Sequence, residues 1–383
     1  TTNNVTKTDA DGRFMLSGIK GSSPVRITAW ASGYYIGGGE THLPGSEGIV
    51  IQLMPLIDGD NEDYAWQSAH AEAGQEGNCE NCHSDATGLL PYDEWLLDAH
   101  SQSTSNGRFL NMYLCTHIIG NQSPPTQKNC TTYYGCFPRP PDPDKPYYGP
   151  GYKLDFPGSA GNCAACHAPA AAVNNPLGVD PSSVTGVGGE GVACDFCHKV
   201  WDVKLDPADE LPFAHMPGVM SYELRRPPEG HQFFAGPFDD VAPGEDTFSP
   251  LQRESAYCAP CHSAVFWDTL VYNSYGEWLA SPYSNLESGQ SCQDCHMPAR
   301  GVEYFARPDK GGLRRDPQAI TSHLMPGASN EALLQSAVTM DVDVQRLNGQ
   351  VIVTVTITND KTGHHVPTDS PLRNILLLVQ ATD

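Results

Sequence analysis

The sequence has few of the residues that build an ordinary protein interior. Hydrophobic residues make up only 39% of the 383 positions, while 37 Gly and 32 Pro interrupt regular structure. This composition excludes an architecture dominated by long helices or wide sheets. We therefore expect an interior filled by something other than aliphatic side chains, because burial of apolar surface is what drives folding.

Long apolar runs and positive charge are scarce as well. The best apolar candidates, residues 49–57 and 351–357, are far shorter than the roughly 18 residues that a membrane-spanning helix needs. The net charge of −23 argues against binding to nucleic acid or to an anionic membrane. We expect no membrane span in this segment. No leader precedes Thr1, so any export signal has been removed or lies outside the sequence.

Cysteine, by contrast, is abundant and follows one pattern. Ten of the 13 Cys lie in five C-x-x-C-H motifs. Two thiols one helical turn apart can bond the two vinyl groups of a haem, while the next imidazole reaches the iron. The cysteines are Cys79 and Cys82, Cys163 and Cys166, Cys194 and Cys197, Cys258 and Cys261, and Cys292 and Cys295. The histidines are His83, His167, His198, His262 and His296.

Neither chance nor a different kind of cysteine site accounts for this pattern. Roughly 0.02 matches are expected by chance from the Cys and His frequencies of the chain. A zinc site needs two C-x-x-C pairs per metal, and a thioredoxin-like motif occurs once within a βαβ pattern. We predict five covalently bound haem c groups. The motif spacings of 84, 31, 64 and 34 residues indicate close pairs of the second with the third haem and of the fourth with the fifth.

Nine further histidines can supply a second imidazole to each iron, which gives low-potential haem suited to electron transfer. We expect His70 and His100 on short amphipathic helices, and His323 in a loop. His364 is favoured over its neighbour His365. The remaining candidates, His215 and His231, flank a Pro-rich loop after the third motif. His42 and His117 are taken as ordinary residues, and ligation by Met216, Met220 or Met297 is a minor option.

Three cysteines lie outside the motifs, in an insertion rich in Pro, Tyr and Asn. Their odd number predicts one disulfide and one remaining thiol. The pair is Cys115 with Cys136, or Cys130 with Cys136.

The chain divides into three parts by composition. Residues 1–57 alternate short β-prone stretches (13–16, 25–30 and 48–53) with turns and predict a partial β-sandwich. Residues 58–335 carry the motifs and predict a mostly irregular and α multihaem cytochrome domain with a haem-filled core. Residues 336–383 predict the start of a second β-sandwich, with strands at 338–346, 351–358 and 375–381. Two incomplete ends suggest a segment of a larger polypeptide.

Two regions resemble known families. Residues 8–35, with the string T-D-A-D-G-R-F, resemble the carboxypeptidase-regulatory-like β module. Residues 64–370 resemble multihaem cytochromes of the cytochrome c-554 and hydroxylamine-oxidoreductase group, on the five motifs, the W-L-L-D-A-H string at His100, the C-Q-D-C-H-M-P string at Cys292 and the G-H-H-V-P-T string at Gly363. The resemblance implies that His364 ligates a haem. Some relatives form extracellular filaments in which a neighbouring subunit supplies an axial His.

Electron transfer is the function that these patterns favour. We expect an exported protein, periplasmic or extracellular, because haem is attached after export. Its partners would be redox proteins or an extracellular electron acceptor, and possible self-association into a filament is implied by the resemblance. The alternative is an oxidoreductase acting on a small nitrogen or sulfur compound at one open haem, but all five motifs end in His.

Overall fold

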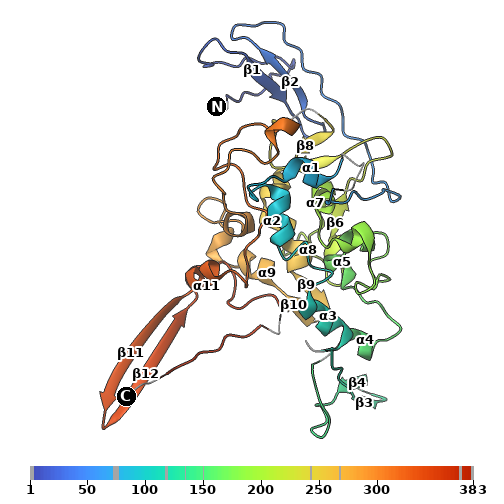
Figure 1. Cartoon of the computed structure of the whole chain (residues 1–383), viewed down its shortest axis with the longest axis vertical. Helices are drawn as coiled ribbons and strands as arrows, with labels where there is room; N and C mark the ends of the chain where they lie inside the picture. The colour runs from blue at the N-terminus through green and yellow to red at the C-terminus, as the bar shows by residue number, and fades with distance from the viewer. Residues whose placement is uncertain are drawn as a thin grey trace.

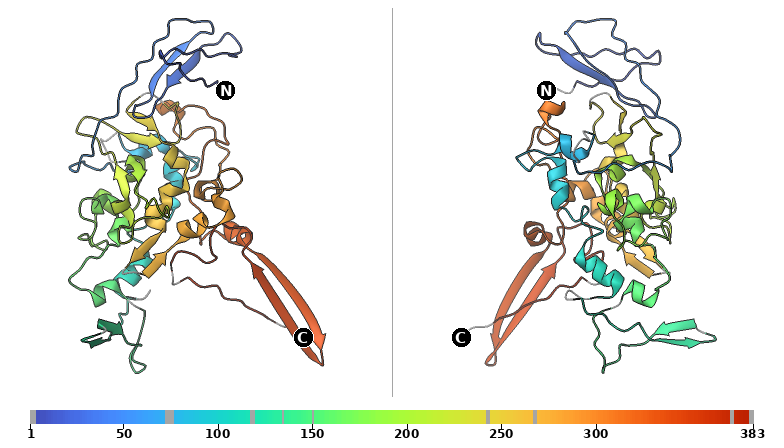
Figure 2. Two further views of the ribbon diagram at one scale, coloured as in Figure 1. Left: turned by 180° about the vertical axis from the view of Figure 1, so that it is seen from behind. Right: turned by 45° about the vertical axis from the view of Figure 1, so that its right-hand side comes forward.

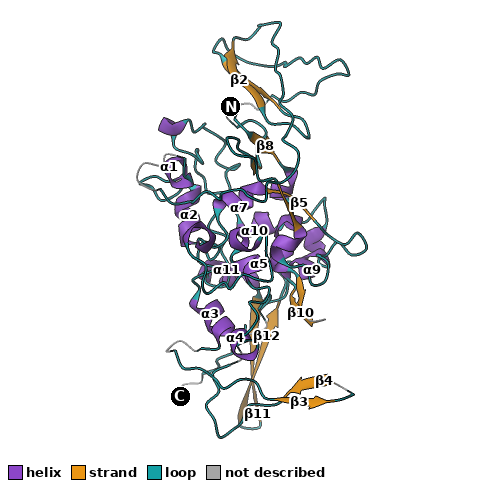
Figure 3. Cartoon of the chain, turned by 90° about the vertical axis from the view of Figure 1, so that its right-hand side faces the viewer, coloured by secondary structure: helices purple, strands orange, loops and turns teal. Residues whose placement is uncertain are grey.

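The computed structural model describes residues 4–71, 77–116, 120–133, 135–149, 151–241, 244–266, 269–370 and 373–380. Short helices and small sheets are joined by long loops throughout these residues (Figure 3). The longest of the described helices, α3, has only eight residues. The expectation of low regular secondary structure is therefore confirmed.

Most of the helices are one or two turns long. In chain order the α-helices are α1 (Cys79–His83), α2 (Pro91–Leu97), α3 (Gly107–Leu114), α4 (Tyr152–Asp155), α5 (Ala164–His167), α6 (Pro169–Ala172), α7 (Cys194–Lys199), α8 (Ala259–His262), α9 (Ser274–Leu279), α10 (Cys292–His296) and α11 (Glu331–Ala337). Short 3₁₀ turns are η1 (Gly186–Gly189), η2 (Gly218–Ser221), η3 (Pro250–Arg253), η4 (Ser255–Cys258), η5 (Pro282–Ser284) and η6 (Pro308–Lys310).

Every sheet among the described residues has two strands. The antiparallel pairs are β1 (Val25–Ala29) with β2 (Gly37–His42), β3 (Lys128–Thr131) with β4 (Gly135–Pro138), β5 (Val200–Val203) with β6 (Tyr222–Leu224), β9 (Ala264–Phe266) with β10 (Thr269–Tyr272), and β11 (Thr339–Leu347) with β12 (Gln350–Thr358). Strands β7 (Phe234–Gly236) and β8 (Asp246–Phe248) pair in parallel.

The molecule is elongated, with a central body and three extensions. The β1–β2 sheet lies at one end, the β3–β4 hairpin lies at the other, and the long β11–β12 hairpin projects sideways from the body (Figures 1 and 2). The helices that carry the five motifs lie within the body, with α8 near its centre. The motif-bearing residues are therefore gathered in one part of the fold.

The largest cluster of buried apolar side chains lies between the second and third motifs. It is built largely from small residues, among them Ala164, Ala165, Ala168 and Ala172, around the ring of Phe196. Such side chains bring backbones close together but bury little apolar area each. The polypeptide alone thus supplies a thin core in this body.

The N-terminal region packs on a strand that supports the third motif. Tyr35 and Leu56 form a buried cluster with Phe233 and Ala235 of the segment around β7. The backbone amide of Ile36 donates to the carbonyl of Asp246 at 2.9 Å. Contacts from residues far apart in the sequence therefore fix β7, whose Ala235 touches a motif histidine.

A predicted helix is absent at His70, and this prediction is wrong. Residues 64–70 form an irregular segment because carboxylates, not the carbonyls of a helix, accept from their backbone amides. The amide of Gln67 donates to Asp195 and that of Ala69 donates to Glu190, both at 2.8 Å. At His100 the expected helix exists as α2, but it ends three residues earlier, at Leu97.

The expected terminal strands are found in part. The two strands predicted at 338–346 and 351–358 are confirmed as β11 and β12, and the strand predicted at 25–30 is confirmed as β1. Residues 13–16, 48–53 and 375–380 are not strands, since none of them forms a ladder with another described segment; position 381 lies outside the described residues. Neither sandwich is seen among the residues described in these regions, where each region shows one two-stranded sheet.

One predicted disulfide forms and joins β3 to β4. The bond links Cys130 with Cys136, one of the two pairings left open by the sequence. Cys115 is instead buried at the end of α3, where its Sγ lies 3.3 Å from the carbonyl oxygen of Gly149. Within the part of the chain that is described, no helix is long and apolar enough to cross a membrane.

Candidate haem-binding sites

All five C-x-x-C-H motifs form a single helical turn. They are α1, α5, α7, α8 and α10, with the first cysteine just outside the helix in α5 and α8. In α5 and α8 both intervening residues are buried, whereas the cysteines and the histidine stay partly exposed. This arrangement follows from the spacing, because positions i, i+3 and i+4 share one face of a helix. The two thiols and the imidazole of these motifs therefore face the same space.

The Nδ1 atom of each motif histidine meets a hydrogen-bond acceptor. Four of them lie 2.7–3.1 Å from backbone carbonyl oxygens: His83 from Phe305, His167 from Ser103, His198 from Ala235, and His296 from Pro326. The fifth, His262, lies 3.1 Å from the carboxylate of Asp369. A carbonyl oxygen can only accept, so Nδ1 carries the proton in the neutral ring and Nε2 presents its lone pair. This is the arrangement found in metal-ligating histidines.

Burial favours the neutral form of four of these rings. It lowers the pKa of His167 to about 4 and also lowers the pKa of His83, His198 and His296. Neutral imidazole is the form that binds a metal. At His262 burial also lowers the pKa, but the Asp369 carboxylate together with the Cys261 and Cys292 thiols outweighs burial, and the net result is a pKa of about 9.

Two surplus histidines lie opposite motif histidines. The ring centroid of His100 is 6.2 Å from that of His262, and the centroid of His364 is likewise 6.2 Å from that of His296. Two imidazoles on opposite sides of one metal would be separated by roughly 6 Å, given metal–nitrogen bonds of about 2.0 Å and about 1.1 Å from nitrogen to centroid. The two pairs thus have the separation that axial ligands of a shared iron require.

His364 and His365 differ as neighbours in one loop. His364 faces His296, and its Nδ1 lies 2.9 Å from the carbonyl oxygen of His365. The side chain of His365 is 79% exposed and pairs with Glu277 at 3.1 Å. Only the first of the two is therefore placed beside a motif.

His323 lies deep in the body near the first and third motifs. Burial and, to a smaller extent, the nearby imidazoles of His198 and His83 together lower its pKa to about 4. Its backbone amide donates to Glu94 at 2.7 Å, and its buried Nδ1 has no well-formed hydrogen bond among the described residues. The residue is therefore held in its neutral form close to two motif histidines.

His70 lies in an aromatic setting beside the same two motifs. Its Nδ1 is 2.8 Å from the hydroxyl of Tyr92, and its ring is 5.8 Å from that of Trp95. Cys79 and Cys194 pack against the buried cluster that contains both aromatic residues. The residue is thus held next to motif thiols although its segment is not helical.

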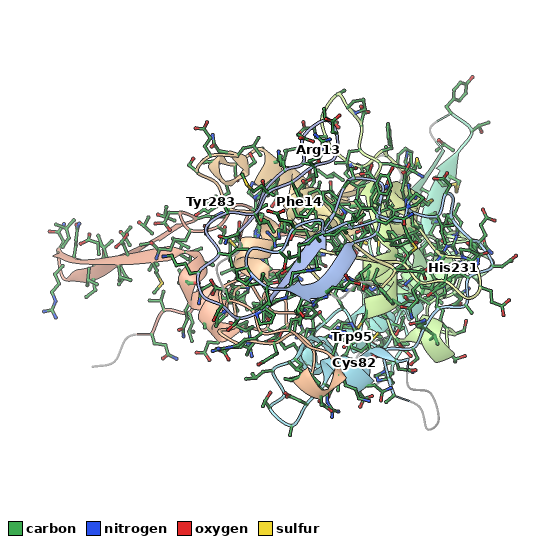
Figure 4. The ribbon with its side chains drawn as sticks, turned by 90° about the horizontal axis from the view of Figure 1, so that it is seen from above. Arg13, Phe14, Cys82, Trp95, His231 and Tyr283 are labelled. Carbon is green, nitrogen blue, oxygen red and sulfur yellow. A yellow bond between two sulfur atoms is a disulfide. The ribbon has the colours of Figure 1, made fainter. Side chains whose placement is uncertain are left out.

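The other two candidates occupy different surroundings. His215 has a left-handed backbone, with φ of 64°. It lies three residues before η2, which contacts both α5 and α8. The side chain of His231 is 49% exposed and pairs with Glu245 at 2.6 Å. Figure 4 shows His231 near the edge of the molecule, and no ring contact joins it to a motif histidine in the described part. His117, taken as an ordinary residue, lies outside the described residues.

Contacts between thiols show which motifs are neighbours. The hydrogen bond between the Cys79 and Cys194 thiols lowers the pKa of Cys79 and raises that of Cys194. Likewise a hydrogen bond joins the thiols of Cys166 and Cys261, and another joins those of Cys258 and Cys292. The first motif therefore adjoins the third, and the fourth adjoins both the second and the fifth. The second and third motifs share the largest core cluster, but their thiols contact other motifs.

The third motif is linked to the fourth through η4, the turn that precedes the fourth motif. The hydroxyl of Tyr257 donates to the carbonyl oxygen of Cys197 at 2.9 Å, and the side-chain amide of Gln252 donates to the same oxygen at 3.3 Å. The fourth motif consequently touches the second, third and fifth. It is the central member of the group.

Several acidic residues hold the sites, and sequence reasoning missed them. Asp98 contacts His100, Asp369 contacts His262, and Asp195 of α7 binds the segment that carries His70. Asp98 could have been found, because an acid two residues before a candidate ligand can fold back on it. Nothing in the sequence around Asp369 or Asp195 indicates their partners, which lie more than 100 residues away.

The donor set fits c-type haem. Each motif offers two thiols and one imidazole with a free Nε2, and two of them have a second imidazole at the required separation. Elsewhere in the described residues, no group of three or more His, Cys, Asp or Glu side chains comes together that could hold a bare metal ion.

Comparison with known proteins gives one finding. No protein-family model and no curated protein sequence matches the chain. Among solved structures, the chain is similar to a penta-heme cytochrome c552 from Thermochromatium tepidum, with a TM-score of 0.47 and 21% identity over 76% of this chain and 67% of that chain. Similarity at this level does not assign the chain to a family.

Proposed function

We propose that the chain is a multihaem c-type cytochrome that transfers electrons through five covalently bound haems. The observation that carries the proposal is the state of the five motif imidazoles. Each is oriented by a hydrogen bond at Nδ1 and presents Nε2 on the same helical turn as two thiols. Bound haem supplies a one-electron iron couple at each site.

The surplus histidines complete the coordination in this proposal. His100 serves the site of His262, and His364 serves the site of His296, on the strength of the ring separations. His323 serves the first or third motif, near which it is buried. His70 and His215 are assigned to the remaining sites from their positions beside motif helices. His231 is then the surplus residue.

The polypeptide positions and shields the five sites. The backbone carbonyls and Asp369 fix the planes of the motif imidazoles, so that little rearrangement accompanies a change of iron charge. Apolar rings cover some of the imidazoles; for example, Phe109 stacks on His167 at 3.6 Å. The adjacency of the motifs gives a route from the first to the third and fourth, with branches to the second and fifth. No position on this route requires a mobile carrier.

We infer a setting outside the cytoplasm, since haem is attached to such motifs after export. Redox proteins or an extracellular acceptor are the proposed partners, and a second copy of the chain in a filament is a further one. The net charge of −23 supports partners with positive surfaces. Localisation by immunogold labelling or cell fractionation, together with electron microscopy of the native material, tests this setting.

Mass spectrometry of the intact native protein tests the function most directly. We expect the mass of the polypeptide plus five haems, and low-spin spectra that change reversibly between oxidised and reduced forms. The bare polypeptide mass would overturn the proposal. A high-spin ferric signal together with turnover of nitrite or hydroxylamine would favour an oxidoreductase instead.

A further inference from the structure

The fourth motif differs from the others in the groups that accept hydrogen bonds from its histidine and from the histidine opposite it. At the other four motifs, Nδ1 of the motif histidine meets a neutral backbone carbonyl. At the fourth motif, both His262 and its partner His100 meet carboxylates. Among the described residues, this is the one paired site where negative charge is applied to both rings.

Asp98 is a buried carboxylate held close to His100. Its side chain is 3% exposed, and its Oδ2 lies 2.6 Å from Nδ1 of His100. The same oxygen accepts from the backbone amide of His100 at 2.7 Å. Because Asp98 caps the end of α2, its backbone is fixed by the helix and its side chain folds back over the next turn. The contact is therefore built into the local fold.

Asp369 reaches His262 from the C-terminal part of the chain. One oxygen lies 3.1 Å from Nδ1 of His262, and the other accepts from the hydroxyl of Ser274 at 2.7 Å. Ser274 begins α9, so a helix in the body fixes this carboxylate. Asp369 has a left-handed backbone with φ of 61°, which non-glycine residues adopt only where the surrounding structure enforces it.

A carboxylate acceptor acts on an iron ligand differently from a carbonyl. It draws the Nδ1 proton towards itself and makes Nε2 a stronger electron donor, which stabilises the ferric state. The effect is strongest where the carboxylate is removed from water, as Asp98 is, because the local dielectric constant is low.

We propose that Asp98 and Asp369 make the haem of the fourth motif the one of lowest reduction potential in the chain. The inference rests on the proposed function and deepens it. The fourth motif adjoins the second, third and fifth. These positioning residues therefore place the haem of lowest potential at the point where the electron route branches. An electron that reaches the branch then passes on to a neighbouring site, which keeps the branch open for the next.

The ring planes give this site a spectroscopic label. The planes of His100 and His262 are 67° apart, whereas those of His296 and His364 are 18° apart. Axial planes near perpendicular give low-spin ferric haem a large maximum g value, and near-parallel planes give a rhombic signal. Electron paramagnetic resonance during a redox titration can therefore follow the fourth site separately from the fifth.

The first test uses the native holoprotein without mutation. We expect the signal with the large maximum g value to disappear last on reduction, after the rhombic signal attributed to the fifth site. If that signal disappears before the others, the inference is wrong, whatever the behaviour of variants.

The second test replaces the two charges. Asp98→Asn and Asp369→Asn keep the size and a neutral acceptor, so we expect the last reduction step to shift to higher potential in each and further in the double variant. Ser274→Ala should shift the same step in the opposite direction, because the Asp369 carboxylate loses a competing donor. Asp206→Asn is the matched control: this half-buried acid lines the pocket beside Ser263 but bonds to a backbone amide. The potential of the last reduction step should be unchanged in this variant.

Failure of the inference can be distinguished from failure of the proposed function. If the variants retain five haems by mass and titrate reversibly, but the potential of their last reduction step is unchanged, the inference is wrong and the proposed function stands. If the native protein contains no haem, both the inference and the proposed function are wrong. If an Asn variant fails to accumulate, Ser274→Ala and the native titration still decide the matter.

Discussion

The central body and the β11–β12 hairpin differ in two properties, the regularity of their backbone and the burial of their side chains. The hairpin has regular register over nine pairs, and its alternation puts Met340, Val342 and Val344 on one face with Ile357, Val355 and Val353 opposite them. Yet this apolar face is largely exposed. The body has little regular structure, but its motif turns are held by long-range hydrogen bonds. Regularity and burial are therefore separate properties, and in this chain chemistry is associated with burial.

The largest effect should come from removing one cofactor attachment in the body. Cys258→Ala with Cys261→Ala removes both thiols of the central motif, and we expect the mass to fall by one haem of five. Because the small apolar clusters cannot replace that burial, proteolysis should accelerate within the body. Peptide mapping of limited digests measures this, and cleavage confined to the hairpin would contradict the comparison. Replacement of the two disulfide-bonded cysteines, Cys130 and Cys136, is the control and should retain five haems.

A somewhat smaller effect is expected at the buried ion pair of α7. Lys199 and Asp195 are almost fully buried and contact each other, so Lys199→Met leaves an uncompensated carboxylate. We expect a loss of about 3–5 kcal/mol in the free energy of unfolding. Lys153→Met breaks a more exposed pair with Asp180 and should cost about 1 kcal/mol or less. Denaturant titration decides, and equal losses would show that burial is not what distinguishes the pairs.

The loop after the hairpin should affect one site. His364→Ala removes the ring opposite His296, so we expect about one iron in five to become high-spin, with four sites unchanged. The neighbouring His365→Ala should leave the spectra as they are, since its ring is exposed. Optical and electron paramagnetic resonance spectra of the two variants test the assignment. Loss of low-spin signal in the second variant would reverse it.

The smallest effect is expected on the hairpin itself. Val344 is 59% exposed, so Val344→Thr should change the free energy of unfolding of the body by less than about 0.5 kcal/mol. Val200→Ala, at a fully buried position of the body, should cost about 2 kcal/mol. Thermal unfolding followed in the haem absorption band compares the two. A larger loss from the hairpin variant would mean that its apolar face is covered in solution.

The sequence predicted the parts of the fold that depend on local spacing. The motif turns follow from the distance between two thiols and an imidazole, and β11 and β12 follow from alternation. The segment at His70 could not be predicted, because its amides bind Glu190 and Asp195 from far along the chain. The gap of 34 residues did predict that the fourth motif adjoins the fifth, as the contact of Cys258 with Cys292 confirms. The contacts of the first motif with the third and of the second with the fourth could not be predicted, since a gap in the sequence does not fix which thiols meet. Asp369 has no local signal at all.

The loop 363–369 has a mechanical consequence. It begins five residues after β12 ends at Thr358, and it carries both His364, opposite the fifth motif, and Asp369, against the fourth. Glu277 of α9 holds it through the backbone amide of His365 and the hydroxyl of Thr368. A force on the projecting hairpin would therefore reach two candidate haem-binding sites at once through this loop. A partner that binds the hairpin would then change the geometry of His364 and Asp369 together.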